Sequence, residues 1–325
     1  METEFFVRTA AVVGLGLMGG SYAKRLTELG LRVIGIDRTE AAEAAALQDG
    51  AIAAAGPAHL AEAELVIFAV PEAATEAFVR THAGAFRRGA VLTDAAGVKR
   101  GGAARIEALL PEDVDFVSAH PMAGREGAGY GQSSAAIFRG ANYILVPSAR
   151  NRPSSLRLVR RLAEALGAAH IEETTPEAHD RMLAYTSGLP HAAAAAVMES
   201  ASFRREARYF IAGGFRDVTR IADINGALWA DLFLENRENM LRELARYEEA
   251  LSRLRRALAA EDREALRDFL DSAGRRKRSL ADGQHTCGTG KGFVRHHDRE
   301  GADGPHGAAR AAGAPAGGEA RGHHG

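Results

Sequence analysis

Short apolar runs alternate with helix-forming segments along the first half of the chain. The run at 10–13 meets a glycine-rich turn, and the residues at 22–29 have the spacing of a helix that Gly30 ends. Further strands are predicted at 32–36, 65–70, 90–93 and 114–119, and further helices at 40–48, 73–85 and 103–109. Strands separated by helices at this spacing require right-handed crossovers, so we expect a mostly parallel sheet with ligands at the carboxyl ends of its strands.

The pattern changes after Pro147. A polar link at 148–155 and one remaining candidate strand at 168–171 precede long apolar helices, predicted at 176–201 with an interruption at its internal proline, and at 228–259. We therefore expect an α/β domain over residues 1–150 and a helical domain over residues 151–280.

Apolar residues form a heptad seam along the helix predicted at 228–259. They recur at alternating steps of four and three residues, as Met240, Leu244, Tyr247, Leu251, Leu254 and Leu258. Such a seam needs a second helix to cover it, either within the domain or across a dimer interface. A dimer is favoured because a short helical domain has few partners for so long a stripe, and we expect a homodimer.

The composition shifts again at residues 281–325. Glycine, alanine and histidine account for 12, 9 and 6 of these 45 residues, and this segment is predicted to be a disordered, low-complexity tail. Its histidines include two well-separated pairs, which are a weak metal signal, so no metal site is predicted.

Overall composition narrows the class of protein. The 325 residues are 46% hydrophobic and 26% charged, enough for two globular domains. Because 41 basic residues balance 42 acidic ones, nothing indicates nucleic acid or an anionic membrane as a partner. The single cysteine, Cys287, fits a reducing compartment, and the acidic N-terminus is unlike a signal peptide. No apolar run reaches the length of a membrane span, and we expect a cytoplasmic protein.

The turn after the first strand contains Gly14, Gly16 and Gly19 in the spacing G-x-G-x-x-G. Between a strand and a helix, such glycines permit a tight turn, a close approach to a pyrophosphate and close packing of the helix on the strand. Asp37 closes the second strand, where a carboxylate would bind the ribose hydroxyls and repel a 2′-phosphate. These features predict an NAD site, although Arg38 could instead accept the phosphate of NADP.

Neighbouring residues complete the predicted cofactor site. Leu17 and Met18 lie within the glycine-rich turn, and Val70 and Pro71 end the strand predicted at 65–70. Their backbones would lie at the same carboxyl edge of the sheet.

Four polar motifs lie outside the glycine-rich turn. They read "TDAAGVKR" at 93–100, "HPMAGREG" at 120–127, "HDRMLAYTSGLPH" at 179–191 and "GGFRDVTRIAD" at 213–223. With these four motifs and "GLGLMGGS" in the turn, the chain resembles the prephenate dehydrogenase family over roughly residues 8–275.

The resemblance implies an α/β Rossmann-type dinucleotide-binding domain followed by an all-α dimerisation domain, with the active site between them. It also implies NAD-dependent oxidative decarboxylation of prephenate to 4-hydroxyphenylpyruvate, in tyrosine biosynthesis. Hydride leaves the hydroxyl-bearing ring carbon, the ring carboxylate departs as carbon dioxide, and the ring becomes aromatic. Arogenate or cyclohexadienyl dehydrogenase is the alternative within the family.

The same resemblance implies roles for several residues. His120 matches the catalytic histidine, whose neutral imidazole accepts the hydrogen bond of the ring hydroxyl. Arg220 matches the arginine that binds a substrate carboxylate, which a planar guanidinium does in a bidentate manner. His191 matches a second active-site histidine, and Glu126 an acidic residue that helps to gate the pocket.

Four further positions bear on the pocket. Asp217 and Trp229 fall where the family places pocket-closing residues. Gly97 stands where many members carry serine, and Gly188 where many carry histidine. Both departures are expected to enlarge the pocket and remove polar contacts, which leaves the choice between prephenate and arogenate open.

Two other classes of protein remain as alternatives. A related 3-hydroxy acid dehydrogenase would use a catalytic lysine, but Lys277 is the only lysine in the helical domain before the tail. A non-enzymatic dinucleotide sensor would have no need of polar motifs around a second ligand.

Overall fold

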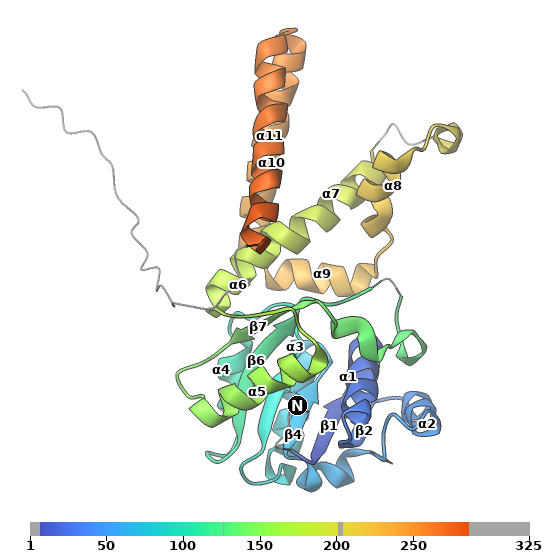
Figure 1. Cartoon of the computed structure of the whole chain (residues 1–325), viewed down its shortest axis with the longest axis vertical. Helices are drawn as coiled ribbons and strands as arrows, with labels where there is room; N and C mark the ends of the chain where they lie inside the picture. The colour runs from blue at the N-terminus through green and yellow to red at the C-terminus, as the bar shows by residue number, and fades with distance from the viewer. Residues whose placement is uncertain (1–6, 126, 201–203, 286–325) are drawn as a thin grey trace, which may run out of the picture. The chain divides into compact units, whose positions relative to one another are not determined.

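The computed structural model describes residues 7–125, 127–200 and 204–285. The chain divides into two compact units, residues 1–253 and 254–325, and each is described separately below. Within the described part of the first unit, an eight-stranded sheet has the order β3-β2-β1-β4-β5-β6-β7-β8 (Figure 1). Its strands are β1 (Thr9–Val13), β2 (Arg32–Ile36), β3 (Ala54–Ala55), β4 (Leu65–Phe68), β5 (Val91–Asp94), β6 (Asp115–Pro121), β7 (Asn142–Val146) and β8 (His170–Glu173). All neighbouring pairs are parallel except β6 and β7.

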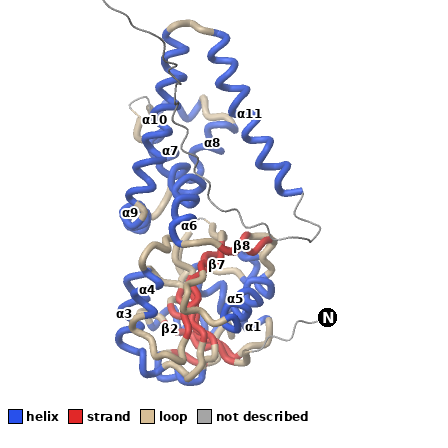
Figure 2. The backbone as a smooth tube through the Cα atoms, turned by 90° about the vertical axis from the view of Figure 1, so that its left-hand side faces the viewer, coloured by secondary structure: helices blue, strands red, loops and turns tan. Residues whose placement is uncertain are grey.

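Helices cover both faces of this sheet (Figures 1 and 2). They are α1 (Leu17–Glu28), α2 (Glu40–Gln48), α3 (Glu72–His82), α4 (Gly102–Glu107) and α5 (Pro153–Leu166). Side chains of α1 and α5 pack with Ala10 and Val12 of β1, whereas side chains of α3 and α4 belong to the core that contains Ala11 and Val13. Successive residues of a strand point to opposite faces, so β1 is buried on both sides, as a parallel sheet between two helical layers requires.

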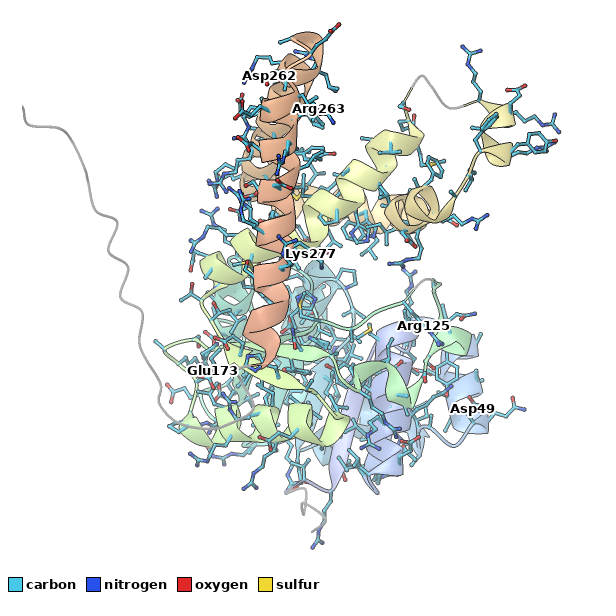
Figure 3. The ribbon with its side chains drawn as sticks, turned by 45° about the horizontal axis from the view of Figure 1, so that its top comes forward. Asp49, Arg125, Glu173, Asp262, Arg263 and Lys277 are labelled. Atoms are coloured by element: carbon cyan, nitrogen blue, oxygen red, sulfur yellow. The ribbon has the colours of Figure 1, made fainter. Side chains whose placement is uncertain are left out.

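The first domain continues beyond residue 150. The polar link leads into α5, which begins at Pro153, and then into β8 at the edge of the sheet. Arg160 of α5 donates to Glu173, the last residue of β8, at 2.5 Å. Glu173 is labelled in Figure 3. The sheet therefore ends at Glu173, about 23 residues beyond the predicted boundary at residue 150, because the hydrophobic pattern did not predict strand β7 or helix α5.

A helical segment follows the sheet within the first unit. Its first part is a continuous helix made of α6 (Pro176–Leu183), a π-helical turn (Ala184–Gly188) and α7 (Leu189–Met198). Pro190 lacks a backbone N–H, and the helix widens just before it instead of breaking. Three later helices are α8 (Gly213–Thr219), α9 (Gly226–Glu235) and α10 (Arg237–Ala259).

The helix predicted at 228–259 is divided into α9 and α10 at Asn236. The side chain of this buried asparagine donates to the carbonyl oxygen of Asp180 in α6 at 2.8 Å, a contact that a helical pattern does not reveal. Along α10, Met240 of the predicted seam is buried, whereas Leu251 and Leu258 are 47% and 58% exposed.

The second unit contains the end of α10 and helix α11 (Arg263–His285). Helix α11 thus includes the first five residues of the segment predicted to be a disordered tail, and the rest of that segment lies outside the described residues. None of the helices in the described ranges is long and apolar enough to cross a membrane.

Candidate active site

The glycine-rich turn joins β1 to the amino end of α1. Gly14 has φ +88°, and its N–H donates to the carbonyl oxygen of Ile36 at 2.7 Å. A Cβ atom at Gly19 would lie 1.6 Å from the carbonyl oxygen of Gly14, so only glycine allows α1 to approach the turn this closely. Gly16 precedes the first residue of α1, and a Cβ atom there would meet open space. The backbone at Gly16 is thus accessible to a ligand at the positive end of the helix dipole.

Asp37 lies directly after β2 and binds the same turn. Its carboxylate accepts from the N–H of Leu15 at 2.7 Å and from the N–H and hydroxyl of Thr39 at 2.9 and 2.8 Å. Burial opposes its ionisation, but these hydrogen bonds and the neighbouring Arg38 hold its pKa below 3.8. A fixed negative charge therefore lies at the end of β2, and Arg38 is exposed beside it.

The other predicted cofactor-binding residues lie at the same edge. Leu17 and Met18 begin α1, whereas Val70 and Pro71 connect β4 to α3. Val70 is close to the turn, because a Cβ atom at Gly14 would lie 2.4 Å from Val70 Cγ1. Strands β2, β1 and β4 are neighbours and parallel, so the carboxyl ends that carry these residues are brought together.

His120 lies near the carboxyl end of β6 and lines a cavity of about 170 Å³. The cavity is bounded by β6, the loop after β5 and the helical segment, through Gly97, Val98, Leu183, Ala184, Ser187, Gly188, Trp229, Leu232, Phe233, Asn236 and Met240. Desolvation, the positive charge of Lys99 and the adjacent His179 hold the pKa of His120 well below 6.5. His120 is therefore neutral at neutral pH and able to accept a proton.

A buried ion pair supports the backbone next to His120. Lys99 Nζ lies 2.7 Å from a carboxylate oxygen of Asp94 and donates to the carbonyl oxygen of Ala119 at 2.5 Å. Asp94 also accepts from the Ser118 hydroxyl at 3.0 Å and the Ala119 N–H at 2.8 Å. These bonds join β5 to β6 and the loop after β5, and they hold the end of β6 in place.

His120 contacts a second histidine from α6. His120 Nδ1 lies 3.0 Å from His179 Nε2, and His179 Nδ1 lies 2.8 Å from the carboxylate of Asp180. Both α6 side chains are buried, with exposed fractions of 5% and 0%.

The helical segment also carries His191 and Trp229. Their rings are stacked with centroids 3.7 Å apart, and His191 Nδ1 lies 2.8 Å from the carbonyl oxygen of Ser187. Trp229 lines the cavity, so His191 lies directly behind one of the cavity walls.

The remaining predicted site residues are more dispersed. Arg220 is exposed in a short 3-10 helix (Arg220–Ala222) that packs against α7, and Asp217 is exposed in α8. Neither is among the described residues that line the cavity with His120. Glu126 lies outside the described residues.

Neighbouring side chains fill the space beside Gly97 and Gly188, the two positions where many family members carry serine and histidine. A Cβ atom at Gly188 would lie 2.3 Å from Met240 Sδ, and one at Gly97 would lie 3.1 Å from Leu232 Cδ2. The expectation that both changes enlarge the pocket is therefore wrong, because methionine and leucine side chains occupy the adjoining volume. The cavity wall is apolar at both positions.

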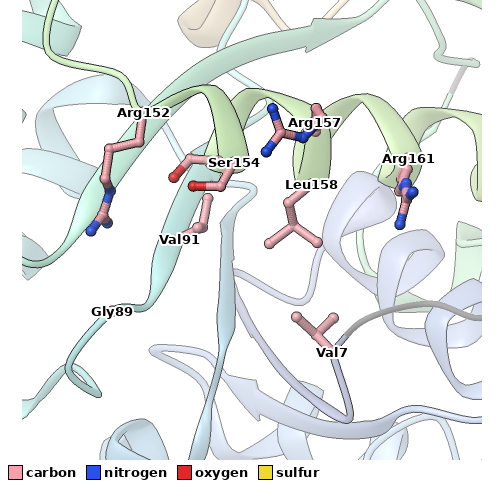
Figure 4. A pocket seen from close by; sticks show the side chains of 9 residues that line it. Val7, Gly89, Val91, Arg152, Ser154, Arg157, Leu158 and Arg161 are labelled. Carbon is pink, nitrogen blue, oxygen red and sulfur yellow. The ribbon is translucent and has the colours of Figure 1, made fainter.

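A separate pocket of about 460 Å³ lies near the amino ends of the strands (Figure 4). Its lining includes Arg152, Arg157 and Arg161 of the α5 region and residues next to β1 and β5, such as Val7 and Gly89. Ligands of doubly wound sheets bind at the carboxyl ends, so this pocket is not the candidate active site. The described ranges contain no group of three or more side chains suited to a metal ion, and the histidine pairs of the tail lie outside them.

Sequence reasoning missed the buried residues that support His120. Asp94, Lys99, His179 and Asp180 all lie in quoted motifs, yet only their three-dimensional contacts reveal a shared role. The dipeptide His179-Asp180 near the start of a helix was the available signal, since a histidine next to an acid often has an oriented ring.

A glycine-rich turn at the amino end of a helix and a histidine that lines a cavity at the carboxyl edge of the same sheet are typical of a nucleotide-dependent dehydrogenase. Two family models match the chain: "Prephenate dehydrogenase, nucleotide-binding domain" at residues 22–172 and "Prephenate dehydrogenase, dimerization domain" at residues 175–272. The boundary between these matches falls at the end of β8. The chain belongs to the prephenate dehydrogenase family.

Relatives of known class cover most of the chain. A prephenate dehydrogenase of Bacillus subtilis (strain 168) is 30% identical over 276 residues, which are 82% of this chain and 74% of the relative. A cyclohexadienyl dehydrogenase of Zymomonas mobilis is 30% identical over 281 residues, 83% of this chain and 95% of the relative. The crystal structure of A. aeolicus prephenate dehydrogenase, in complex with hydroxyphenyl propionate and NAD+, has a TM-score of 0.78 and 28% identity, and the match covers 86% of this chain and 100% of that chain.

Proposed function

We propose that this protein is an NAD-dependent prephenate dehydrogenase in which His120 is the proton acceptor. The reaction converts prephenate and NAD+ to 4-hydroxyphenylpyruvate, carbon dioxide and NADH. The observation that carries the proposal is the position of His120, which lines a cavity at the carboxyl edge of the sheet, where burial and the charge of Lys99 lower its pKa.

The role of His120 follows from the charges that develop on the substrate. A bound NAD+ would supply the hydride acceptor for the ring carbon that bears the hydroxyl group. As the hydride leaves, the hydroxyl becomes acidic, and the imidazole of His120 accepts its proton. When the ring carboxylate is lost as carbon dioxide, the electrons of the broken carbon–carbon bond make the ring aromatic and its oxygen basic, and His120 returns the proton to that oxygen. The proton balance is therefore zero.

Binding of the nucleotide is assigned to the glycine-rich turn and Asp37. The open space at Gly16 and the amino end of α1 suit a pyrophosphate, and the ionised Asp37 suits ribose hydroxyls. The same negative charge would repel a 2′-phosphate. Exposed Arg38 lies beside Asp37 and would favour NADP, and we propose that NAD is preferred.

Substrate orientation is assigned to the helical segment. Arg220 is proposed to bind a substrate carboxylate in a bidentate manner, because the guanidinium geometry matches two carboxylate oxygens. His191 is proposed to hold Trp229 against the cavity through the stacked rings. Glu126 is proposed to gate the pocket, and Asp217 to close it near Arg220.

We also propose that the protein is a homodimer. The family model that matches residues 175–272 describes a dimerization domain. Exposed Leu251 and Leu258 on α10 provide apolar surface for a second copy. Light scattering after size-exclusion chromatography should give about twice the mass of the 34.4 kDa chain, and a monomer at micromolar concentration would contradict this.

The experiment for the proposed function measures initial rates with prephenate and with arogenate, each with NAD and with NADP. Prephenate and NAD should give the highest kcat/KM, with one carbon dioxide released for each NADH. A higher kcat/KM with arogenate would favour the alternative, which similarity to a cyclohexadienyl dehydrogenase keeps open. Absence of turnover with both substrates, from folded protein that binds NAD, would contradict both functions.

A further inference from the structure

His120 is the first member of a hydrogen-bonded chain of three side chains, of which the second and third are buried. His120 Nδ1 lies 3.0 Å from His179 Nε2, and His179 Nδ1 lies 2.8 Å from Asp180 Oδ1. The second and third members belong to the first turns of α6, where the Thr175 hydroxyl accepts from the N–H of Ala178 and caps the helix. The proposed reaction uses neither His179 nor Asp180 directly.

Both oxygens of Asp180 accept hydrogen bonds from backbone groups. Oδ1 accepts from the N–H of Lys99 at 2.9 Å, and Oδ2 accepts from the N–H of Arg100 at 2.9 Å. The backbone of Asp180 is held in turn, because Asn236 donates to its carbonyl oxygen at 2.8 Å. The carboxylate is therefore fixed in position, and an ionised carboxylate has no proton to donate.

The direction of each hydrogen bond in the chain follows from this acceptor. Because Asp180 only accepts, the proton of the bond to His179 belongs to His179 Nδ1, which leaves a lone pair on its Nε2. That lone pair accepts from His120, so the proton of His120 belongs to Nδ1. The lone pair of His120 is consequently on Nε2, the ring nitrogen that His179 does not contact.

We propose that His179 and Asp180 are positioning residues that hold His120 in the Nδ1-protonated tautomer, so that its Nε2 accepts the proton of the substrate hydroxyl. This inference rests on the proposed function of His120. The opposite tautomer would place a hydrogen on Nε2 toward the substrate, and His120 would then be unable to act as a base.

The surrounding contacts favour an orienting role over simple core packing. A buried histidine in a core needs its two ring nitrogens satisfied, and any two partners suffice. Here the two partners of His179 are the side chain that faces the cavity and a carboxylate anchored to the loop of Lys99 and Arg100. That loop also carries Gly97 and Val98, which line the same cavity, so α6 and the cavity wall are joined through Asp180.

The tautomer can be tested without any substrate. The full chain is labelled with 15N-histidine, and the His120 resonances are identified among the 12 histidines by their loss in His120→Asn. At neutral pH the proposal requires a protonated-nitrogen shift at Nδ1 and a lone-pair shift at Nε2. A proton on Nε2 of His120 would overturn it, whatever reaction the protein catalyses.

Two substitutions of His179 distinguish the effect of its hydrogen bond with His120 from that of its hydrogen bond with Asp180. The shorter amide of His179→Asn retains a donor for Asp180 but loses the contact with His120. The longer amide of His179→Gln places an acceptor oxygen near His120 Nδ1. We expect His179→Asn to lower kcat about 10- to 100-fold. This loss is smaller than the factor of about 10²–10⁴ that acid–base catalysis contributes, because His120 itself is retained. KM and the Kd of NAD should change less than about threefold.

His179→Gln should recover most of the kcat lost in His179→Asn and keep the Nδ1-protonated signal of His120. His170→Asn is the matched control, because His170 also contacts a carboxylate, that of Glu172 at 3.0 Å, but is exposed on β8. Equal losses of kcat in the two His179 variants, or losses that follow their thermal stability, would mean that His179 has a structural role only. If no variant or wild type turns over prephenate, the tautomer measurement still decides the inference.

Discussion

Lys99 Nζ lies 2.7 Å from the carboxylate of Asp94, and the two side chains are 1% and 7% exposed. Burial lowers the pKa of Lys99 below 10.5, while the carboxylates of Asp94 and Asp180 partly offset this effect. A buried pair of this kind contributes little net stability compared with apolar residues, but it is costly to break. Its position beneath Ala119 makes it a support for His120, the next residue in β6.

Removing the ammonium group should therefore destabilise the protein. In Lys99→Met, the carboxylate of Asp94 would stay buried without a counter-charge, and the free energy of unfolding should fall by about 3–5 kcal/mol. Urea unfolding followed by circular dichroism measures this change. Arg88→Met breaks the exposed pair with Asp113 and should leave the urea midpoint unchanged. Similar small effects of both substitutions would contradict the supporting role of Lys99.

Two glycines of the turn should respond differently to alanine. In Gly19→Ala, the new Cβ would collide with the carbonyl oxygen of Gly14, so stability should fall by about 1–3 kcal/mol or more. In Gly16→Ala, the new Cβ meets open space, so stability should be retained while the Kd of NAD rises at least about tenfold, because the methyl group occupies the room of the pyrophosphate. Fluorescence titration and thermal melts measure both. Normal NAD binding by Gly16→Ala would show that the nucleotide lies elsewhere.

The pH profile should reflect the environment of His120. Because desolvation, Lys99 and His179 lower its pKa, the neutral form persists below pH 6.5. The value of kcat/KM should therefore stay level as pH falls through 6.5 and decline only at lower pH. The same lowered pKa affects stability. As pH falls below about 6.5, the unfolded state binds a proton on His120 before the folded state does, so the free energy of unfolding decreases until the pH reaches the lowered pKa of the folded state. The contribution of His120 to stability is therefore complete above about pH 6.5. A decline of kcat/KM for prephenate centred at pH 6.5 or above, measured at saturating NAD, would contradict this assignment.

Gly188 and Met240 should be energetically coupled. In Gly188→Ala, the new Cβ would lie 2.3 Å from Met240 Sδ, and we expect a loss of about 1 kcal/mol, because only the flexible end of the methionine must shift. Met240→Ala alone should cost about 2–5 kcal/mol because it leaves a cavity. In the double variant the cost of Gly188→Ala should disappear, since the methyl group enters the vacated space. Additive losses would contradict the contact, and Gly213→Ala, whose Cβ meets open space, is the control.

The sequence predicted the part of the fold that repeats a simple pattern. The strand at 32–36 and the helix at 40–48 have the predicted bounds, and Gly14, Gly19 and Asp37 lie together as expected. Strand β7 was missed because it pairs antiparallel with β6, and because the helix that connects it to the parallel strand β8 begins inside the segment interpreted as a polar link.

The candidate site was predicted less completely. His120 could be predicted from its motif, but the residues that support it form pairs far apart in the chain. His120 and His179 are 59 positions apart, and Lys99 and Asp180 are 81 positions apart. Local spacing contains no information on such contacts. The glycine at position 188 led us to expect an enlarged pocket. Met240 of another helix, α10, fills the space beside this glycine, and the sequence near Gly188 does not reveal that contact.

The most direct measurement of the central claim compares His120→Asn with wild type for kcat with prephenate and for the Kd of NAD. Asparagine cannot take up the proton, so kcat should fall at least about 100-fold. The Kd of NAD and the melting temperature should stay near the wild-type values, because the glycine-rich turn and Asp37 are unchanged. A kcat within about threefold of wild type would show that His120 is not the proton acceptor.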